Sequence, residues 1–296
     1  MARLRGGAHR ASQPDAVDPW SVYLARTEPA LAAHARVHRF ARVPIIAAGS
    51  SPALPIAVWI EDTDPSAVAR TRQALVGSTR APAELLDGPL PAALASTRAR
   101  HVALLRGGDV LAPLALERLG QAAALAPDAA VITCDDDRLD GAGRRHGPRF
   151  RPGPSPDRWL ACDDSGPLLV VARERASRAL RDCTGGPAWR HELALALAGP
   201  ASASHAHVPL LLCHRGPEAP TPPPLAADVL ASLLAQWEPG ASIEQAGTAR
   251  RIHRPLQHEP SVEVIVCLRD RPQLLARCVV SVLARTRYER LSVALV

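Results

Sequence analysis

Short apolar runs alternate with longer amphipathic stretches along most of the chain. The runs are five or six residues long and read 55–60 (PIAVWI), 101–105 (HVALL), 129–133 (AAVIT) and 208–213 (VPLLLC). Between them apolar residues recur with a helical period, as at Leu116, Leu119 and Ala123 after Pro113. A continuous apolar run predicts a strand covered on both faces, so the alternation predicts an α/β fold with a mostly parallel sheet.

The same alternation begins again near the end of the chain. A strand is predicted at 261–268 (SVEVIVCL), then a helix through Leu275 and Val282, then a strand at 291–296 (LSVALV). Such a sheet needs further strands to be covered, so we expect the start of a second domain, truncated at Val296. The predicted organisation is a partly helical N-terminal lead (1–50), a first α/β domain (51–215), a Pro-rich linker with a helix (216–259) and this second start (260–296).

The net charge of +6 comes entirely from arginine, because the chain contains no lysine. A GC-rich coding bias explains this composition, and an anionic partner is the functional alternative. The arginines are scattered, and aromatic residues (3%) do not interleave with them as a base-stacking surface requires. The sequence therefore disfavours nucleic acid as a partner and leaves a phosphate-bearing substrate open.

Cysteine usage and hydropathy bear on the cellular compartment. None of the six cysteines forms a C-x-x-C pair, which is typical of a reduced, cytoplasmic protein. The N-terminus lacks the apolar stretch of a secretory signal, and no window of about 18 apolar residues predicts a membrane span. We expect a soluble cytoplasmic protein.

Several segments resemble family 2 glycosyltransferases. Residues 261–296 are similar to the opening of that domain, through the turn RDRP at 269–272 and the exit RTRY at 285–288. Segments similar to the middle of the domain are HVALLRGGDVLAP (101–113), AAVITCDDDRLDGAGRRHG (129–147), FRPGPSPDRWL (150–160) and VPLLLCHR (208–215). The whole resembles tandem enzymes that build O-antigen or other rhamnose-containing surface polysaccharides.

This resemblance implies the GT-A fold, a mostly parallel sheet with helices on both faces, plus the β-α-β start of a second copy. The nucleotide-sugar donor is then expected at the carboxyl ends of the strands, as in other open α/β sheets. The donor-binding residues expected from the resemblance are Glu61, Asp62, Arg106, Asp109, Asp135, Asp137, Arg269 and Asp270. A capping turn explains Glu61 and Asp62 almost as well, and a solvated acidic turn is the alternative for Asp135–Asp137.

The resemblance also implies a divalent cation, Mn²⁺ or Mg²⁺, held by an Asp-x-Asp element and stabilising the departing diphosphate. The matching residues here are Arg106-Gly107-Gly108-Asp109, so both acidic positions are replaced and only the trailing Asp109 remains as a metal ligand. Either the first domain is degenerate and non-catalytic, or Arg106 itself meets the diphosphate. A misaligned segment is the third possibility.

The acceptor hydroxyl requires a general base, for which the resemblance indicates Glu192 within GGPAWRHELAL (185–195). An exposed helical Glu is the alternative for this residue. His205 and His207 lie two apart on a predicted strand, but no third metal ligand accompanies them. His214 matches a histidine at the end of the family's strand and has no assigned role.

Two functions follow from these observations. The first is a glycosyltransferase that moves a sugar from a nucleotide-sugar donor to a cell-surface polysaccharide, with a glycan or lipid-linked glycan as acceptor. The second is a non-catalytic pseudo-glycosyltransferase module that binds glycan or scaffolds a partner catalytic domain. Either would act in the cytoplasm, and the resemblance leaves open a peripheral association with the inner face of the plasma membrane.

Overall fold

The computed structural model describes residues 18–36, 45–47, 52–61, 64–199, 204–217, 223–247, 249–256 and 258–296. The chain divides into two compact units, Met1–Ile252 and His253–Val296, and each is described by itself. The predicted boundaries at 50, 215 and 259 remain a prediction. Within the described ranges, no helix is long and apolar enough to cross a membrane.

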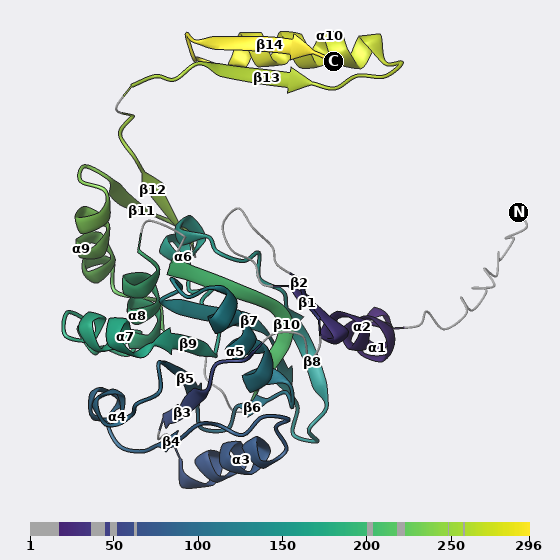
Figure 1. Cartoon of the computed structure of the whole chain (residues 1–296). Coiled ribbons are helices and arrows are strands. Elements are labelled where there is room, and N and C mark those ends of the chain that lie inside the picture. Colours follow the sequence, from purple (N-terminus) through teal and green to yellow (C-terminus); the bar gives the residue numbers. More distant parts are fainter. Residues whose placement is uncertain are drawn as a thin grey trace, which may run out of the picture. The chain divides into compact units, whose positions relative to one another are not determined.

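The first unit is built on an eight-stranded sheet with the order β4-β3-β5-β9-β7-β10-β6, in which β8 pairs with β7 (Figure 1). Its strands are β3 Ile56–Glu61, β4 Leu85–Leu86, β5 His101–Arg106, β6 Val110–Leu111, β7 Val131–Leu139, β8 Arg145–Arg149, β9 Leu169–Ala172 and β10 His205–Arg215. The pairings give β3, β4, β5, β7 and β10 one common direction, and β6, β8 and β9 the opposite one. The expected α/β class with a mostly parallel sheet is confirmed and is consistent with a GT-A-like fold.

Helices cover both faces of this sheet, as the apolar runs predict. They are α3 Pro65–Val76, α4 Leu90–Ser96, α5 Ala115–Leu125, α6 Pro156–Ala161, α7 Arg173–Ala179, α8 Trp189–Ala198 and α9 Ala227–Trp237. Alternate residues of β3 enter different cores: Ile56 and Val58 pack with α3 and α5, while Ala57 and Trp59 pack with α4 and α6–α9. This alternation follows from the two-residue period of a strand.

The sequence pattern does not distinguish the direction of β9. An apolar strand at 168–171 is predicted, and the structure places it between β5 and β7, antiparallel to both. Its register pairs Leu104 with Leu169 and Ile132 with Val170, so apolar residues meet apolar neighbours in the reversed direction as well. Apolarity therefore predicts the strand but not its orientation.

The N-terminal helical segment differs from its prediction, a helix over 20–41 interrupted at Pro29. The structure has α1 Pro19–Val22, a π-helical turn Tyr23–Thr27 and α2 Glu28–Ala33, followed by strand β1 His34–Arg36, which pairs with β2 Ile45–Ala47. The helical course passes through Pro29, the second residue of α2, and the turn directly before it is π-helical rather than α-helical.

The segment predicted as a linker with a helix contributes to the core of the first unit. Leu225, Leu230 and Leu234 are at most 3% exposed and belong to the same core as α8. The hairpin of β11 Ser242–Ala246 and β12 Ala249–His253 follows. The apolar face of α9 therefore anchors this segment to the first unit.

The second unit has the predicted strand–helix–strand order, with β13 Val262–Val266, α10 Pro272–Arg285 and β14 Leu291–Leu295. The two strands are parallel and pair from Val262 with Leu291 to Val266 with Leu295. Ile265 and Val280 are 62% and 65% exposed. The described residues of this unit therefore leave large apolar side chains in contact with solvent.

A test of the first unit's packing is the substitution Gly120→Ala in α5. A Cβ at this position would lie 2.4 Å from the carbonyl oxygen of Leu54, whose N–H donates to the Gly120 carbonyl at 3.0 Å. Because backbone must move, we expect a loss of about 1 to 3 kcal/mol in the free energy of unfolding.

Urea unfolding followed by tryptophan fluorescence measures this loss in the first unit alone, since all five tryptophans lie there: Trp20, Trp59, Trp159, Trp189 and Trp237. Gly141→Ala is the matched control, because its Cβ would have no atom within 4 Å. Equal stability of the two variants would contradict the packing at Gly120.

Candidate functional site

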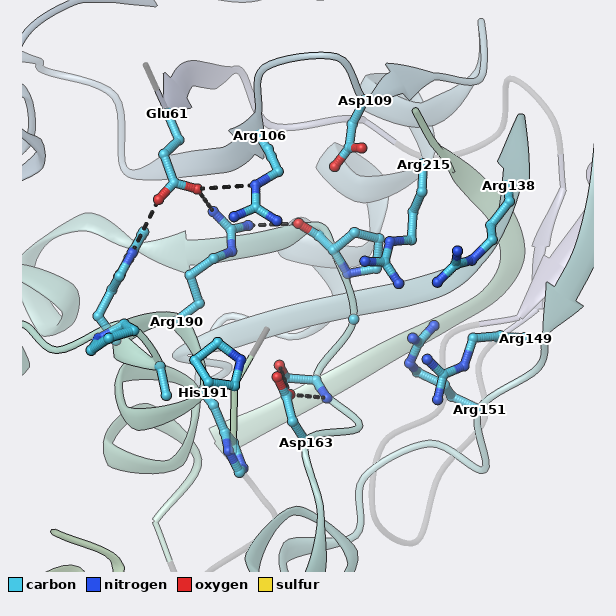
Figure 2. Close-up of a pocket in the computed structure, with 17 residues that line it drawn as sticks. Glu61, Arg106, Asp109, Arg138, Arg149, Arg151, Asp163, Arg190, His191 and Arg215 are labelled. Atoms are coloured by element: carbon cyan, nitrogen blue, oxygen red, sulfur yellow. Dashed lines mark hydrogen bonds and ion pairs between the residues drawn. The ribbon is translucent and has the colours of Figure 1, made fainter. Parts of the chain in front are cut away.

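A cavity of about 400 Å³ lies at the carboxyl ends of the parallel strands (Figure 2). Glu61 ends β3, Arg106 ends β5 and Arg215 ends β10, while Arg138 is the penultimate residue of β7. The other charged lining residues are Asp109, Arg149, Arg151, Asp163 and Arg190. The volume is in the range of small-molecule sites, and the location follows the rule for open α/β sheets.

Glu61 organises one side of the cavity. Its Oε2 lies 3.7 Å from Nη1 of Arg190 and 3.9 Å from Nε of Arg106, and its Oε1 accepts a hydrogen bond from the Trp189 indole at 3.2 Å. Arg190 also donates to the carbonyl oxygens of Leu104 (2.8 Å) and Pro167 (2.6 Å). These contacts hold the start of α8 against the ends of β3 and β5.

Asp109 is a buried carboxylate that also lines the cavity. It is 1% exposed, and its Oδ1 accepts a hydrogen bond from the N–H of Gly216 at 3.1 Å. A Cβ at Gly216 would lie 2.7 Å from the carbonyl oxygen of Gly108, so only glycine fits this close approach. Burial raises the pKa of Asp109 to about 6, although Arg190, Arg215 and Arg106 oppose the shift.

The residues at the expected cation site do not fit a divalent ion. Asp109 supplies one carboxylate, which is held by Gly216, and the positions of the other two acidic ligands are Arg106 and Gly108. The pKa of Asp109 responds to three nearby guanidinium groups, whose charges repel a dication. Among the described residues, no group of three His, Cys, Asp or Glu side chains could hold a metal ion.

The acidic run Asp135–Asp137 belongs to strand β7, so the alternative of a solvated turn is wrong. All three side chains are at most 3% exposed, and none lines the cavity. Asp136 pairs with Arg151, a lining residue, while Asp135 accepts a hydrogen bond from the N–H of Arg151 at 2.8 Å. The run therefore positions the segment after β8.

Asp137 belongs to a second network, which consists of hydrogen bonds and ion pairs to His214, Arg145 and Glu28. Its Oδ1 accepts a hydrogen bond from Nδ1 of His214 (2.6 Å), and its Oδ2 from Nε of Arg145 (2.7 Å). The other two nitrogens of Arg145 donate to both carboxylate oxygens of Glu28 in α2, at 2.8 and 2.6 Å. This network connects β10, β7 and β8 to the N-terminal helical segment.

His205 and His207 form a buried hydrogen-bonded chain with Thr133 and Asp135. His207 donates from Nε2 to the Asp135 carboxylate at 3.1 Å, and its Nδ1 lies 3.0 Å from the Thr133 hydroxyl. That hydroxyl also forms a hydrogen bond with Nε2 of His205 at 2.8 Å, and burial lowers the pKa of His205 to about 3. Both histidines are therefore structural in the described part of the chain.

Glu192 lies on α8 but outside the cavity lining. It is 3% exposed, so the alternative of an exposed helical Glu is wrong. Its Oε1 accepts from the N–H of Thr184 and its Oε2 from the Thr184 hydroxyl, both at 2.8 Å. The structure brings Glu61, Arg106 and Asp109 together and does not bring Glu192 to them.

The remaining expected site residues lie elsewhere. Asp62 is outside the described residues. Arg269 and Asp270 belong to the second unit, where they are exposed and lie 3.6 Å apart in an ion pair. Asp270 does not cap α10, whose N-cap residue is Arg271 without a side-chain cap, and its φ of 55° is in the left-handed region.

The sequence analysis missed the lining residues Arg138, Arg149, Arg151, Asp163, Arg190 and Arg215. Arg215 comes two residues after the apolar run 208–213, so the rule for strand ends could have identified it, whereas Asp135–Asp137 separate Arg138 from its apolar run. Arg149 and Arg151 reach the cavity because β8 folds back on β7, with Asp136 opposite Arg149. That hairpin has no equivalent local signal in the sequence.

Comparison with known proteins gives a curated relative and distant structural likenesses. The chain is 33% identical over 215 residues to the O-antigen biosynthesis protein RfbC of Myxococcus xanthus, covering 68% of this chain and 17% of that protein. The crystal structure of S. aureus TarS 1-349 superposes with a TM-score of 0.36 and 10% identity, over 55% of this chain and 60% of that one. A likeness at that level supports no argument about function. No protein-family profile matches the chain.

Replacing Asp109 with asparagine should change how stability depends on pH. A carboxyl whose pKa is raised in the folded state, here to about 6 from 3.8, binds its proton more tightly when folded. Its ionisation therefore costs stability as pH rises, by about 1 to 1.5 kcal/mol between pH 5 and pH 7.5 in the wild type.

The amide side chain of Asp109→Asn cannot ionise, yet it retains an acceptor for the Gly216 N–H, so the variant should lack this loss. Urea unfolding of both proteins at the two pH values gives the difference directly. Identical pH dependence in the two proteins would show that Asp109 titrates in its ordinary range.

Proposed function

We propose that the chain is part of a family 2 glycosyltransferase whose first unit binds a nucleotide-sugar donor for transfer to a cell-surface polysaccharide. The observation that carries this proposal is the cavity at the carboxyl ends of the sheet, whose lining has twice as many arginines as carboxylates. Such a lining suits the diphosphate of a nucleotide sugar. Similarity to RfbC, a protein named for O-antigen biosynthesis, supports the same role.

The finer parts of the proposal follow from the resemblance. The acceptor is a glycan or lipid-linked glycan, and the protein works in the cytoplasm, where peripheral contact with the inner face of the plasma membrane would bring it to that acceptor. The chain spans 17% of the length of RfbC, so a sugar-transfer activity like that of a full-length protein is itself part of the proposal.

A non-catalytic donor- or glycan-binding module is the second candidate, and two observations favour it. Arg106 and Gly108 stand where the resemblance puts acidic metal ligands. Both carboxylate oxygens of Glu192 accept hydrogen bonds from Thr184, so the Glu192 side chain is held against the loop before α8. In this case the first unit would retain the donor site and lack the base.

Recognition of the nucleoside is tested at Glu61, at the end of β3, where the resemblance implies a contact with the nucleobase. We expect Glu61→Gln to weaken UDP or dTDP binding by about tenfold, because a charged acceptor for the nucleoside is lost. Inorganic pyrophosphate should bind equally well or more tightly, because the cavity loses a negative charge. Calorimetric titration measures both ligands.

Glu84→Gln is the control for this experiment, since Glu84 is exposed and outside the cavity lining. If Glu61→Gln increases the affinity for UDP or dTDP and the affinity for pyrophosphate by the same factor, Glu61 makes no contact with the nucleoside. If no nucleoside diphosphate binds more tightly than pyrophosphate, the proposed donor site is wrong.

A turnover assay separates the enzyme from the module. A transferase should release nucleoside diphosphate from UDP- or dTDP-linked hexoses, and Glu192→Gln should abolish this release in a variant that still unfolds cooperatively if Glu192 is the base. The control is Glu174→Gln, an exposed glutamate of α7. Donor binding without release, in wild type as in Glu192→Gln, identifies the module.

A further inference from the structure

The positive charge of the cavity is unevenly distributed. Figure 2 shows Glu61 with Arg106 and Arg190 on one side, and the guanidinium groups of Arg138, Arg149 and Arg215 together on the other. Arg106 and Arg190 share the Glu61 carboxylate, so their charges are partly compensated. The second group comes from three strands: Arg138 and Arg215 lie at the ends of the parallel strands β7 and β10, and Arg149 is the last residue of the antiparallel β8, opposite Asp136 of β7.

Two carboxylates near the second group, Asp136 and Asp164, are shared with other arginines. Asp136 pairs with Arg151. Asp164 lies 4.0 Å from Arg149, the outer limit of an ion pair, and also contacts Arg151 (3.8 Å) and pairs with Arg158. One carboxylate divided among three guanidinium groups compensates each of them weakly.

The three arginines repel one another. The pKa of Arg215 is lowered, first by burial and then by the charge of Arg138, with Arg149 acting in the same direction. Asp109 and Asp136 oppose the shift. Holding like charges together on one wall of a cavity costs free energy, and a bound anion offsets that cost.

We propose that Arg138, Arg149 and Arg215 bind the diphosphate group of the donor directly, in place of the metal ion that the resemblance implies. The identity of the donor rests on the proposed function, whereas the diphosphate chemistry rests on the arginines. A guanidinium group is planar, stays charged at neutral pH and donates two parallel hydrogen bonds to phosphate oxygens. Three strand-borne guanidinium groups can therefore neutralise a diphosphate without a dication.

The test uses inorganic pyrophosphate, which lacks the nucleoside, titrated calorimetrically into the full chain in EDTA and then in excess Mg²⁺ or Mn²⁺. We expect binding in EDTA, with no gain from either metal beyond that caused by complexation of free pyrophosphate. Arg149→Gln should weaken binding by about tenfold, as should Arg138→Gln, since each removes a charge-assisted contact.

Arg144→Gln is the matched control. It removes the same charge from the same β7–β8 hairpin, but the Arg144 side chain is 81% exposed, contacts Asp140 and does not line the cavity. Arg144→Gln should weaken pyrophosphate binding by less than about twofold, because exposed charges are largely screened by salt. Melting temperatures confirm folding, and the Arg149 side chain, 51% exposed, can be shortened without opening the core.

Three results would overturn the proposal: binding that requires the metal, an equal loss in Arg144→Gln and Arg149→Gln, or no binding under any condition. The proposed function fails differently. If pyrophosphate binds through Arg149 but no nucleoside adds affinity, the anion site stands and the donor assignment falls. If UDP or dTDP binds only with metal, the donor assignment stands and the arginine site falls.

Discussion

Burial of the central strands on both faces is the constraint on which the rest of the structure depends. β3 and β5 contribute to the apolar cores on both faces of the sheet, and β10 is buried along nearly all its length, so charged side chains are tolerated chiefly where each strand ends. Because these strands run in one direction, their charged ends meet at one edge of the sheet. Glu61, Arg106 and Arg215 therefore line a common cavity, although 154 residues separate the first from the last.

β7 is the exception, since it continues beyond its apolar part through three buried aspartates. Each finds a partner on another element: Asp135 at His207, Asp136 at Arg151 and Asp137 at His214 and Arg145. Removing one partner would leave a buried charge without compensation, which is far more costly than losing an exposed pair. The acidic run thus stabilises the sheet and its hairpin, and Arg151, the partner of Asp136, reaches the cavity.

The sequence predicts the elements better than it predicts the site. Length, apolar runs and helical periodicity identify β3, β5, β7, β10 and the βαβ of the second unit, because these signals are local. The reversed direction of β9 and the approach of Arg149 depend on tertiary pairing, which leaves no mark on a single segment. The placement of Glu192 shows the same limit, since its segment matches the resemblance while its carboxylate turns to Thr184.

The β7–β8 hairpin has a mechanical consequence. Arg145 begins β8 and clasps Glu28 of α2, while Arg149 ends the same five-residue strand at the cavity wall. A strand advances about 3.3 Å per residue, so roughly 13 Å of extended backbone joins the two guanidinium-bearing positions. Such a strand, paired with β7, fixes the spacing between the two positions. One short strand thus connects the N-terminal helical segment to the wall of the cavity.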